Sequence, residues 1–365
     1  MTKEAHRTLT VDHLVLECGE VLSDVVVSYM SWGELNSRRD NALLLFHALN
    51  CTQNVEQWWG PLLGPGRALD TERYFVFCAN VLGGCWGTCG PDDVNPKTGQ
   101  RYGGDFPAIT IRDMVRLDAA VLRQLGVASV VCCAGGGLGG MLALEYALEI
   151  AEPRTRSIAS LCSAGRHHPW QIGWGECERQ AIMADPLWKD GHYSPDQPPT
   201  AGLGVARMMA MISYRTHPAY MKKFGRASDS RRQPGGSEEA AFDVEAYLKH
   251  QGDKFIEKGF SARSYVTLSR AMDSHDVSRG RGPYDKVLGQ IAQPALLVSI
   301  SSDVLYPVPE QLELLRYMKN AQHHTIESDE GHDGFLLEHD KVSTLLQGFL
   351  LSVEANSAID TPPAS

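Results

Sequence analysis

The stretch that decides the fold is CCAGGGLGGMLALEYAL, residues 132–148. It joins an apolar run to a helical pattern through six residues, of which five are glycine. Gly135, Gly137 and Gly140 fit the dinucleotide-binding pattern G-x-G-x-x-G. The same turn has the frame of a nucleophile elbow, G-x-S-x-G, with Gly137 where the serine belongs. These two interpretations give different enzymes.

The segments around this turn alternate between strand and helix patterns. Short apolar runs bounded by turn residues precede it, and a helical spacing of apolar residues over 110–126 leads into the strand pattern 128–135. Strands alternating with helices predict an α/β fold with a mainly parallel sheet covered on both faces. We therefore expect the first part of a core over 1–166, an inserted helical lid over 167–290, the second part of the core over 291–353 and a disordered tail over 354–365.

The dinucleotide interpretation meets two difficulties. It needs an acidic residue, or an arginine for a 2′-phosphate, about 20 residues after the glycines, and only Arg166 is available at the end of the next strand pattern. The motif normally opens its sheet on the first strand, whereas here it lies past residue 130. A lone G-x-G-x-x-G is weak support for a cofactor site.

The elbow interpretation requires two further catalytic residues, and the chain has candidates for both. In α/β-hydrolases an acid and then a histidine follow the nucleophile, each after a late strand. Asp303 follows the apolar strand pattern PALLVSIS, and His332 follows the strand pattern HHTIES within DEGHDG, 29 residues later. Either residue alone is ordinarily a loop residue, but their joint placement favours a catalytic dyad in which Asp303 orients His332.

Composition points to small-molecule chemistry. The chain has 365 residues, 43% of them hydrophobic, and a net charge of −10, which argues against nucleic acid or an anionic membrane as partner. Its nine cysteines are scattered without paired zinc knuckles, so we expect reduced thiols and no metal site. The first residues lack the order of a signal peptide and no apolar run reaches the length of a membrane span, so we expect a cytoplasmic protein.

Long collinear segments of the chain resemble homoserine O-acetyltransferases and their relative, fungal deacetylcephalosporin C acetyltransferase. The segments that carry the likeness are YMSWGELNSRRDNALLLFHAL, WWGPLLGPGRALDTERYFVFCANVLGG, NPKTGQRYGGDFPAITIRDMVR, GGMLALEYAL, ERQAIMADP, GLGVARMMAMISY, YLKHQGDKF and EGHDGF. SRAMDSHDVSRGRG looks more like the fungal and antibiotic-pathway branch.

This resemblance implies an α/β-hydrolase core with a helical lid, a homodimer, no tightly bound cofactor, and acetyl-CoA or another acyl-CoA as co-substrate. The acyl group would move to the hydroxyl of homoserine or a related amino-acid-like or secondary-metabolite alcohol, through an acylated serine in ping-pong fashion. Carried over by position, the acid and base are Asp303 and His332, the oxyanion hole is formed by the backbone N–H groups of Leu49 and Leu138, and the substrate-binding residues are Arg207, Tyr214 and Asp333. Each of the last three also has a structural interpretation: a lid ion pair, a core tyrosine and a helix cap.

The chain departs from the family at the decisive position, because the nucleophile serine falls on Gly137. Glycine has no atom that can attack a thioester, so an acyl-enzyme at this position is excluded. Cys51 and Ser163 are candidate substitutes, whereas Cys133 should be packed in the core. Three hypotheses stay open: an acyltransferase whose serine was engineered out; a natural homologue using His332, Asp303 and the oxyanion hole for hydrolysis, elimination, isomerisation or cyclisation; and a catalytically dead binding partner.

Overall fold

The computed structural model describes residues 6–226 and 242–359 and contains one sheet of eight strands in the order β1-β2-β4-β3-β5-β6-β7-β8. β1 and β2 are antiparallel to their neighbours, and every pair from β4 to β8 is parallel. The strands are β1 (Arg7–Val15), β2 (Val21–Trp32), β3 (Ala42–Phe46), β4 (Phe75–Ala79), β5 (Val130–Gly136), β6 (Ile158–Leu161), β7 (Ala295–Ile300) and β8 (Ala321–Ile326). The expected mainly parallel sheet is confirmed, and β1 is a strand that we did not anticipate.

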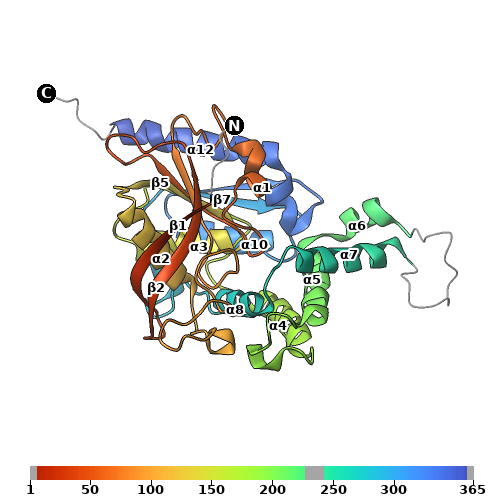
Figure 1. The fold of residues 1–365 in the computed structure, drawn as a ribbon. Helices are drawn as coiled ribbons and strands as arrows, with labels where there is room; N and C mark the ends of the chain where they lie inside the picture. The colour runs from red at the N-terminus through yellow and green to blue at the C-terminus, as the bar shows by residue number, and fades with distance from the viewer. Residues whose placement is uncertain (1–5, 227–241, 360–365) are drawn as a thin grey trace.

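Helices cover both faces of this sheet (Figure 1). The α-helices are α1 (Glu56–Trp59), α2 (Ile111–Gln124), α3 (Leu138–Glu149), α4 (Pro169–Met183), α5 (Thr200–Tyr214), α6 (His217–Phe224), α7 (Asp243–Glu257), α8 (Ala262–Asp273), α9 (Tyr284–Leu288), α10 (Val308–Tyr317), α11 (Gly334–Leu337) and α12 (His339–Ile359). Short 3-10 turns lie at Gly60–Leu62, Gly103–Asp105, Lys189–Gly191 and Gly331–Asp333. None of the helices in these two described ranges has the length and apolar character needed to cross a bilayer.

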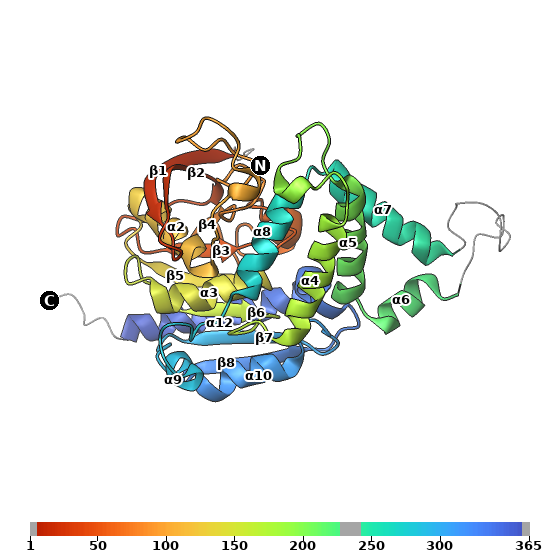
Figure 2. The same ribbon diagram turned by 90° about the horizontal axis from the view of Figure 1, so that it is seen from below.

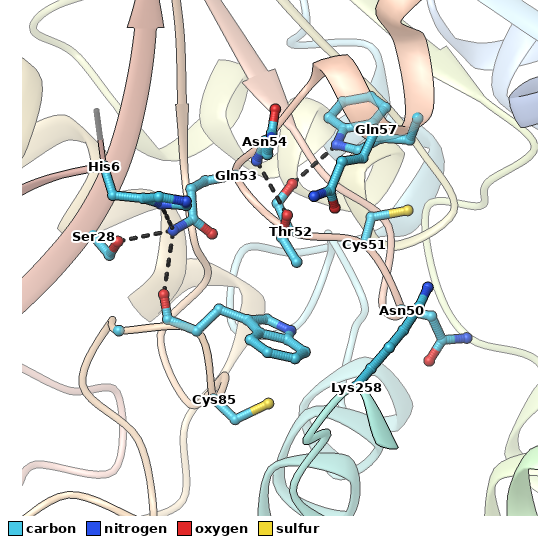
Figure 3. A pocket seen from close by; sticks show the side chains of 13 residues that line it. His6, Ser28, Asn50, Cys51, Thr52, Gln53, Asn54, Gln57, Cys85 and Lys258 are labelled. Carbon is cyan, nitrogen blue, oxygen red and sulfur yellow. Dashed lines mark hydrogen bonds between the residues drawn. The ribbon is translucent and has the colours of Figure 1, made fainter. Parts of the chain in front are cut away.

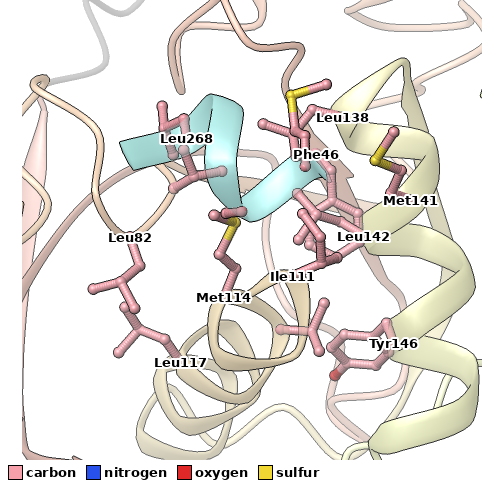
Figure 4. Close-up of a cluster of buried hydrophobic side chains, with 14 of the residues drawn as sticks. Phe46, Leu82, Ile111, Met114, Leu117, Leu138, Met141, Leu142, Tyr146 and Leu268 are labelled. Atoms are coloured by element: carbon pink, nitrogen blue, oxygen red, sulfur yellow. The ribbon is translucent and has the colours of Figure 1, made fainter. Parts of the chain in front are cut away.

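Alternating side chains of β3 supply a core on each face. Leu44 and Phe46 belong to the cluster that α2 and α3 cover, whereas Leu43 and Leu45 belong to the cluster that α1 and α12 cover. Figure 4 shows the first cluster, in which Leu268 of α8 joins the residues from α2 and α3. The segment between β6 and β7 is therefore anchored in the same core as the sheet.

The β5–α3 turn is built from glycines because neighbouring backbone leaves no room for side chains. A Cβ on Gly139 would lie 2.2 Å from the carbonyl oxygen of Phe46, and one on Gly135 would lie 2.4 Å from the same atom. Helix α3 begins at Leu138, three residues before the apolar pattern suggested, because close packing outweighs the low helix propensity of Gly139 and Gly140.

Between β6 and β7 the chain leaves the sheet and forms helices α4 to α9. Figure 2 shows α4 packed beside α5 and α8, with α6 and α7 extending away from the sheet. Part of the expected lid, residues 227–241, lies outside the described residues. We expected a disordered tail from residue 354, and this prediction is wrong for its first residues, because α12 continues to Ile359 through the helix-forming residues Glu354 and Ala355. Residues 360–365 lie outside the described residues.

Candidate active site

A cavity of about 220 Å³ lies between the carboxyl ends of the strands and the helices that follow β6. The structure brings seven of the eight predicted site residues to its wall. They are Leu49, Gly137, Leu138, Arg207, Tyr214, His332 and Asp333. The eighth, Asp303, lies behind His332, where it is buried and hydrogen-bonded to the imidazole.

Asp303 and His332 are paired as the chain order suggested. His332 Nδ1 lies 2.8 Å from Asp303 Oδ2, and the second carboxylate oxygen accepts the backbone N–H groups of Leu305 and Tyr306 at 2.8 and 2.9 Å. Because a carboxylate can only accept, Nδ1 carries the proton in this bond and Nε2 keeps a free lone pair. This arrangement suits a general base whose tautomer is set by the acid.

The position that faces this base is Gly137. Its φ is +57°, and a Cβ built on it would lie 3.1 Å from His332 Nε2 and 3.6 Å from Cε1, with no other atom within 4 Å. A side chain at position 137 would therefore point at the lone pair of the base, which is the geometry of a nucleophile elbow. Glycine accepts this backbone conformation without the strain that a Cβ would add.

Leu49 and Leu138 both line the same cavity. Leu138 is the first residue of α3, so its N–H has no carbonyl partner within the helix. Residues 48–51 form a turn that is closed by a hydrogen bond from the Cys51 N–H to the Ala48 carbonyl. Leu49 is the second residue of this turn, and its own N–H takes no part in that bond. His47, with a pKa that burial lowers to about 4, accepts the N–H of Val81 through Nε2 and holds the start of this loop in place. A pair of free donors beside a base is the arrangement of an oxyanion hole.

Arg207 and Tyr214 reach the cavity from α5. The guanidinium carbon of Arg207 lies 5.0 Å from the ring centre of Phe255 and 5.8 Å from that of Tyr214. Its Nε and Nη1 are buried without a hydrogen-bond partner in the described ranges, and no carboxylate of those ranges pairs with it. The Tyr214 hydroxyl accepts Asn50 Nδ2 at 3.1 Å, and burial raises its pKa. The lid ion pair that we considered for Arg207 is therefore absent among the described residues.

Asp333 follows the base directly and lies 3.6 Å from Arg215 Nη1, which also pairs with Glu330 at 2.8 Å. Burial raises the pKa of the Asp333 carboxyl, and the charge of Arg215 opposes that rise. Asp333 stands at the N-cap position of α11, but its side chain makes no capping bond there. The Asp333 side chain therefore does not act as a helix cap.

Comparison with known proteins identifies the family of this chain. The family model for the alpha/beta hydrolase fold matches residues 41–339. A homoserine O-acetyltransferase of Salinibacter ruber is 50% identical over 343 residues, covering 93% of this chain and 96% of that protein. Another, of Trichormus variabilis, is 47% identical over 345 residues, covering 94% and 93%. The chain belongs to the homoserine O-acetyltransferase family, within the α/β-hydrolase fold.

Solved structures of this family and of related folds superpose on the chain. The homoserine O-acetyltransferase from Bacillus anthracis matches with a TM-score of 0.90 at 24% identity, covering 96% of this chain and 98% of that one. Esterase E22 matches with a TM-score of 0.87 at 23% identity, covering 95% and 100%. At such identities the likeness shows the fold. The expected likeness to fungal deacetylcephalosporin C acetyltransferase stays a prediction.

The other nucleophiles that we considered in place of position 137 are poorly suited to attack. Cys51 lines the cavity, but burial, followed by the charge of Asp333, raises the pKa of its thiol to about 12, so it is protonated at neutral pH. Ser163 is fully buried and does not reach the cavity wall, since its side chain packs under Gly140. Cys133 is buried in β5, as expected, and burial raises its thiol pKa as well.

We did not predict from the sequence a second set of hydrogen-bonded side chains, which lies beside the cavity. The ring centre of Tyr306 lies 5.0 Å from that of His332, and its hydroxyl is hydrogen-bonded to His167 Nε2 at 2.6 Å. His167 Nδ1 in turn lies 3.1 Å from Asp273 Oδ1, and Asp273 pairs with Arg179 at 2.6 Å. The only signal in the sequence was the position of Tyr306 three residues after Asp303, which did not reveal its distant partners.

Cys162 is another residue of this region that we did not predict from the sequence. It follows β6 directly with φ +47°, and its sulfur lies within 4.8 Å of the Asp303 carboxylate and a His332 ring nitrogen. Burial raises the pKa of this thiol well above its usual range. The carboxylate and the imidazole already bond each other, so the thiol completes the packing behind the dyad.

Proposed function

We propose that the protein transfers an acetyl group from acetyl-CoA to the hydroxyl of homoserine or of a closely related amino-acid-like alcohol. The observation that carries this proposal is the pairing of His332 with Asp303, which leaves Nε2 free at a cavity that Leu49 and Leu138 also line. The two bacterial relatives, which are homoserine O-acetyltransferases, suggest the substrate class. They lend no support to a base-only reaction or to a role as a binding partner.

Because Gly137 offers no hydroxyl, we propose that transfer takes place in one step within a ternary complex. His332 Nε2 takes the proton of the acceptor hydroxyl, and the acceptor oxygen attacks the thioester carbonyl. The resulting oxyanion is stabilised by the N–H groups of Leu49 and Leu138. As the carbonyl re-forms, the carbon–sulfur bond breaks and the leaving thiolate takes the proton from His332. The products are the O-acetyl ester and coenzyme A.

The acceptor is placed by three polar residues of the cavity wall. Arg207 carries a guanidinium without a described carboxylate partner and would pair with a carboxylate of the acceptor, and Asp333 would pair with its ammonium group. Tyr214 adds a hydroxyl to the same wall. This set matches the two charged groups of an amino acid and leaves the acceptor's own hydroxyl to approach His332. A secondary-metabolite alcohol that carries the same two groups would also fit.

Initial-rate kinetics test this mechanism. With both substrates varied, one-step transfer predicts intersecting double-reciprocal lines and no acetylated protein by intact mass spectrometry. Gly137→Ser should add an acetylated species of the protein after mixing with acetyl-CoA, because the new hydroxyl would point at His332. Parallel lines for the wild-type protein, or an acetylated wild-type species, would contradict one-step transfer.

Three further features accompany the proposal. We infer that residues 167–290 act as a lid, since helix α5 contributes two residues to the cavity wall. We also infer a cytoplasmic homodimer without a tightly bound cofactor, as the family resemblance implies. Sedimentation velocity of the full chain tests the dimer, and a sedimentation coefficient of a monomer at micromolar concentration would overturn it.

A further inference from the structure

Tyr306 contacts both members of the catalytic dyad. Its backbone N–H donates to Asp303 Oδ1 at 2.9 Å, and its ring centre lies 5.0 Å from that of His332. The ring centres of Phe335 and Tyr214 lie farther from the imidazole, at 5.3 and 5.9 Å. The hydrogen bond to Asp303 alone would let the imidazole turn about that bond, so the rings packed around it decide where Nε2 lies.

The hydroxyl of Tyr306 joins this dyad to a second pair of a histidine and an aspartate. It is hydrogen-bonded to His167 Nε2 at 2.6 Å. His167 Nδ1 lies 3.1 Å from Asp273 Oδ1, and a carboxylate can only accept, so Nδ1 carries the proton in this bond. Asp273 Oδ2 in turn pairs with the buried guanidinium of Arg179 at 2.6 Å. The chain of bonds therefore ends in an ion pair between helices α4 and α8.

Helix α4 holds the same loop at two further points. Trp170 Nε1 donates to the Val304 carbonyl at 2.8 Å, and Gln171 Nε2 donates to the Leu305 carbonyl at 2.6 Å. All three residues that follow the catalytic acid are thus bonded to the start of the segment between β6 and β7.

The loop after β3, which lines the same cavity, is held differently. Gln53 Nε2 donates to Ser28 Oγ at 2.8 Å and to the Trp86 carbonyl at 3.2 Å, as Figure 3 shows. Ser28 belongs to β2, and Trp86 lies in the loop after β4. Asn50 adds one bond to helix α5, through Tyr214 at 3.1 Å. The loop after β7 therefore depends on the inserted helices more than the loop after β3 does.

We propose that Tyr306 is a positioning residue, which fixes the direction of the His332 imidazole and takes its own position from the bond to His167 in the lid. The inference rests on the proposed transfer, in which His332 is the base. The Tyr306 hydroxyl does not react itself, because burial raises its pKa well above the usual range, and its partner His167 does not line the cavity beside the base. A misplacement of about 1 Å can cost about 10²-fold in rate, so loss of this constraint should lower kcat and leave substrate affinity unchanged.

A double-mutant cycle tests the role of the bond between Tyr306 and His167. Tyr306→Phe keeps the ring beside the base and removes the hydroxyl, so kcat should fall roughly fivefold or more, with the acceptor KM within twofold. His167→Ala removes the other partner and should lower kcat about as much. Because both changes break the same bond, the double variant should be no slower than the slower single variant. Fold-changes that multiply in the double variant would overturn the proposal.

A third variant separates the ring from the hydroxyl. Tyr306→Leu removes both and should lower kcat well below that of Tyr306→Phe, by roughly 10²-fold relative to the wild type. Thermal unfolding of each variant confirms that it is folded at the assay temperature. Equal kcat values for Tyr306→Leu and Tyr306→Phe would show that the ring does not place the base.

Matched controls come from the same region of the chain. Tyr284→Phe removes a buried hydroxyl that has no hydrogen-bond partner among the described residues. His168→Asn changes the neighbour of His167, whose imidazole lies 3.8 Å from Glu313 instead. These two variants and their combination should keep kcat within twofold of the wild type.

Proton NMR of the full chain without substrate tests the same placement independently of any transfer. The Nδ1 protons of His332 and His167 each lie in a hydrogen bond to a carboxylate and should give signals far downfield, assigned by their loss in His332→Ala and His167→Ala. Tyr306→Phe should shift or broaden the His332 signal, and an unchanged signal would overturn the proposal. If that signal moves as expected but no acetylated acceptor forms, the positioning role stands and the proposed transfer falls. If transfer occurs and Tyr306→Phe keeps the wild-type kcat, the positioning role falls and the transfer stands.

Discussion

The two sides of the cavity beside His332 are held in different ways. On the sheet side, Gly137, Leu138 and Leu49 occupy turns at strand ends, and His332 is fixed by the buried carboxylate of Asp303. On the lid side, Arg207 extends from α5 with two nitrogens that have no partner among the described residues. On the sheet side the base is fixed by a hydrogen bond that the free protein already makes, whereas on the lid side the guanidinium of Arg207 has no carboxylate partner among the described residues.

The difference has a physical cause. Groups that must stabilise charge during the reaction act best when they are rigid before substrate arrives, since reorganisation would cost free energy at the moment of reaction. Groups that recognise a substrate gain affinity when the ligand supplies their missing partners. Changes on the sheet side should therefore reduce turnover, and changes on the lid side should alter binding or pH response.

The largest effect is expected for His332→Ala. Loss of the base should lower kcat about 10³-fold, which corresponds to roughly 4 kcal/mol of transition-state stabilisation, because no other described residue accepts the acceptor's proton at that point. The acceptor KM should change little, since the charged ends of the acceptor bind elsewhere. Steady-state kinetics measure both constants.

The control for this substitution is His250→Ala on the exposed face of α7, which should leave kcat within twofold. If His332→Ala retained wild-type kcat, the dyad would have no role in catalysis and the proposed reaction would be wrong.

A smaller effect, on stability, is expected for Glu178 on the lid helix α4. Burial raises the pKa of this carboxyl from 4.5 to about 7, although its hydrogen bond from Tyr265 opposes the rise. Between these two pH values the folded chain binds more protons than the unfolded chain, so this residue makes stability fall as pH rises from about 4.5 to 7. Glu178→Gln keeps the shape and removes the titration, so the variant should gain up to about 3 kcal/mol over the wild type between pH 5 and 8.

Urea unfolding of the wild type and of Glu178→Gln at pH 5 and at pH 8 measures this gain in stability. The neighbouring Glu176 is a control of opposite sign, because hydrogen bonds from Gln180 and Arg179 lower the pKa of its exposed carboxyl. Glu176→Gln should lose stability relative to the wild type as pH rises. A free-energy difference that does not change with pH for Glu178→Gln would show that the buried carboxyl is ionised throughout.

The sheet side of the site could be predicted from the sequence because its positions are local. A strand pattern followed by Asp303 or His332 places each residue at the carboxyl edge of a parallel sheet, and Gly137 is located by the glycines around it. The lid side could not be predicted from residue patterns, since Tyr306 and His167 are 139 residues apart in sequence. Arg207 and Tyr214 were found only through the resemblance to the family, because an arginine on an apolar helix has no local signal of its purpose.

Arg207→Ala should have the next smaller effect. The variant lacks the guanidinium that would bind the carboxylate of the acceptor. Its acceptor KM should therefore rise roughly 10- to 100-fold, equivalent to about 1.4–2.8 kcal/mol, while the acetyl-CoA KM stays unchanged. The Tm should not fall by more than a few degrees, since no ion pair of the described residues is broken. Arg270→Ala, on an exposed position of α8, is the control and should leave both constants within twofold. Equal changes in both KM values would indicate a disturbed lid and not a lost carboxylate contact.

The smallest effect is expected for Cys51→Ala, although this residue lines the cavity beside His332. Because burial raises the pKa of its thiol to about 12, only a negligible fraction is thiolate at neutral pH, so Cys51 is a poor nucleophile. Transfer rates should therefore stay within about twofold of the wild type between pH 7 and 9. A loss of 10²-fold or more, together with an acetylated cysteine in the wild-type protein by peptide mass spectrometry, would make Cys51 the nucleophile. The nucleophile would then lie on the loop after β3, and transfer in one step would be wrong.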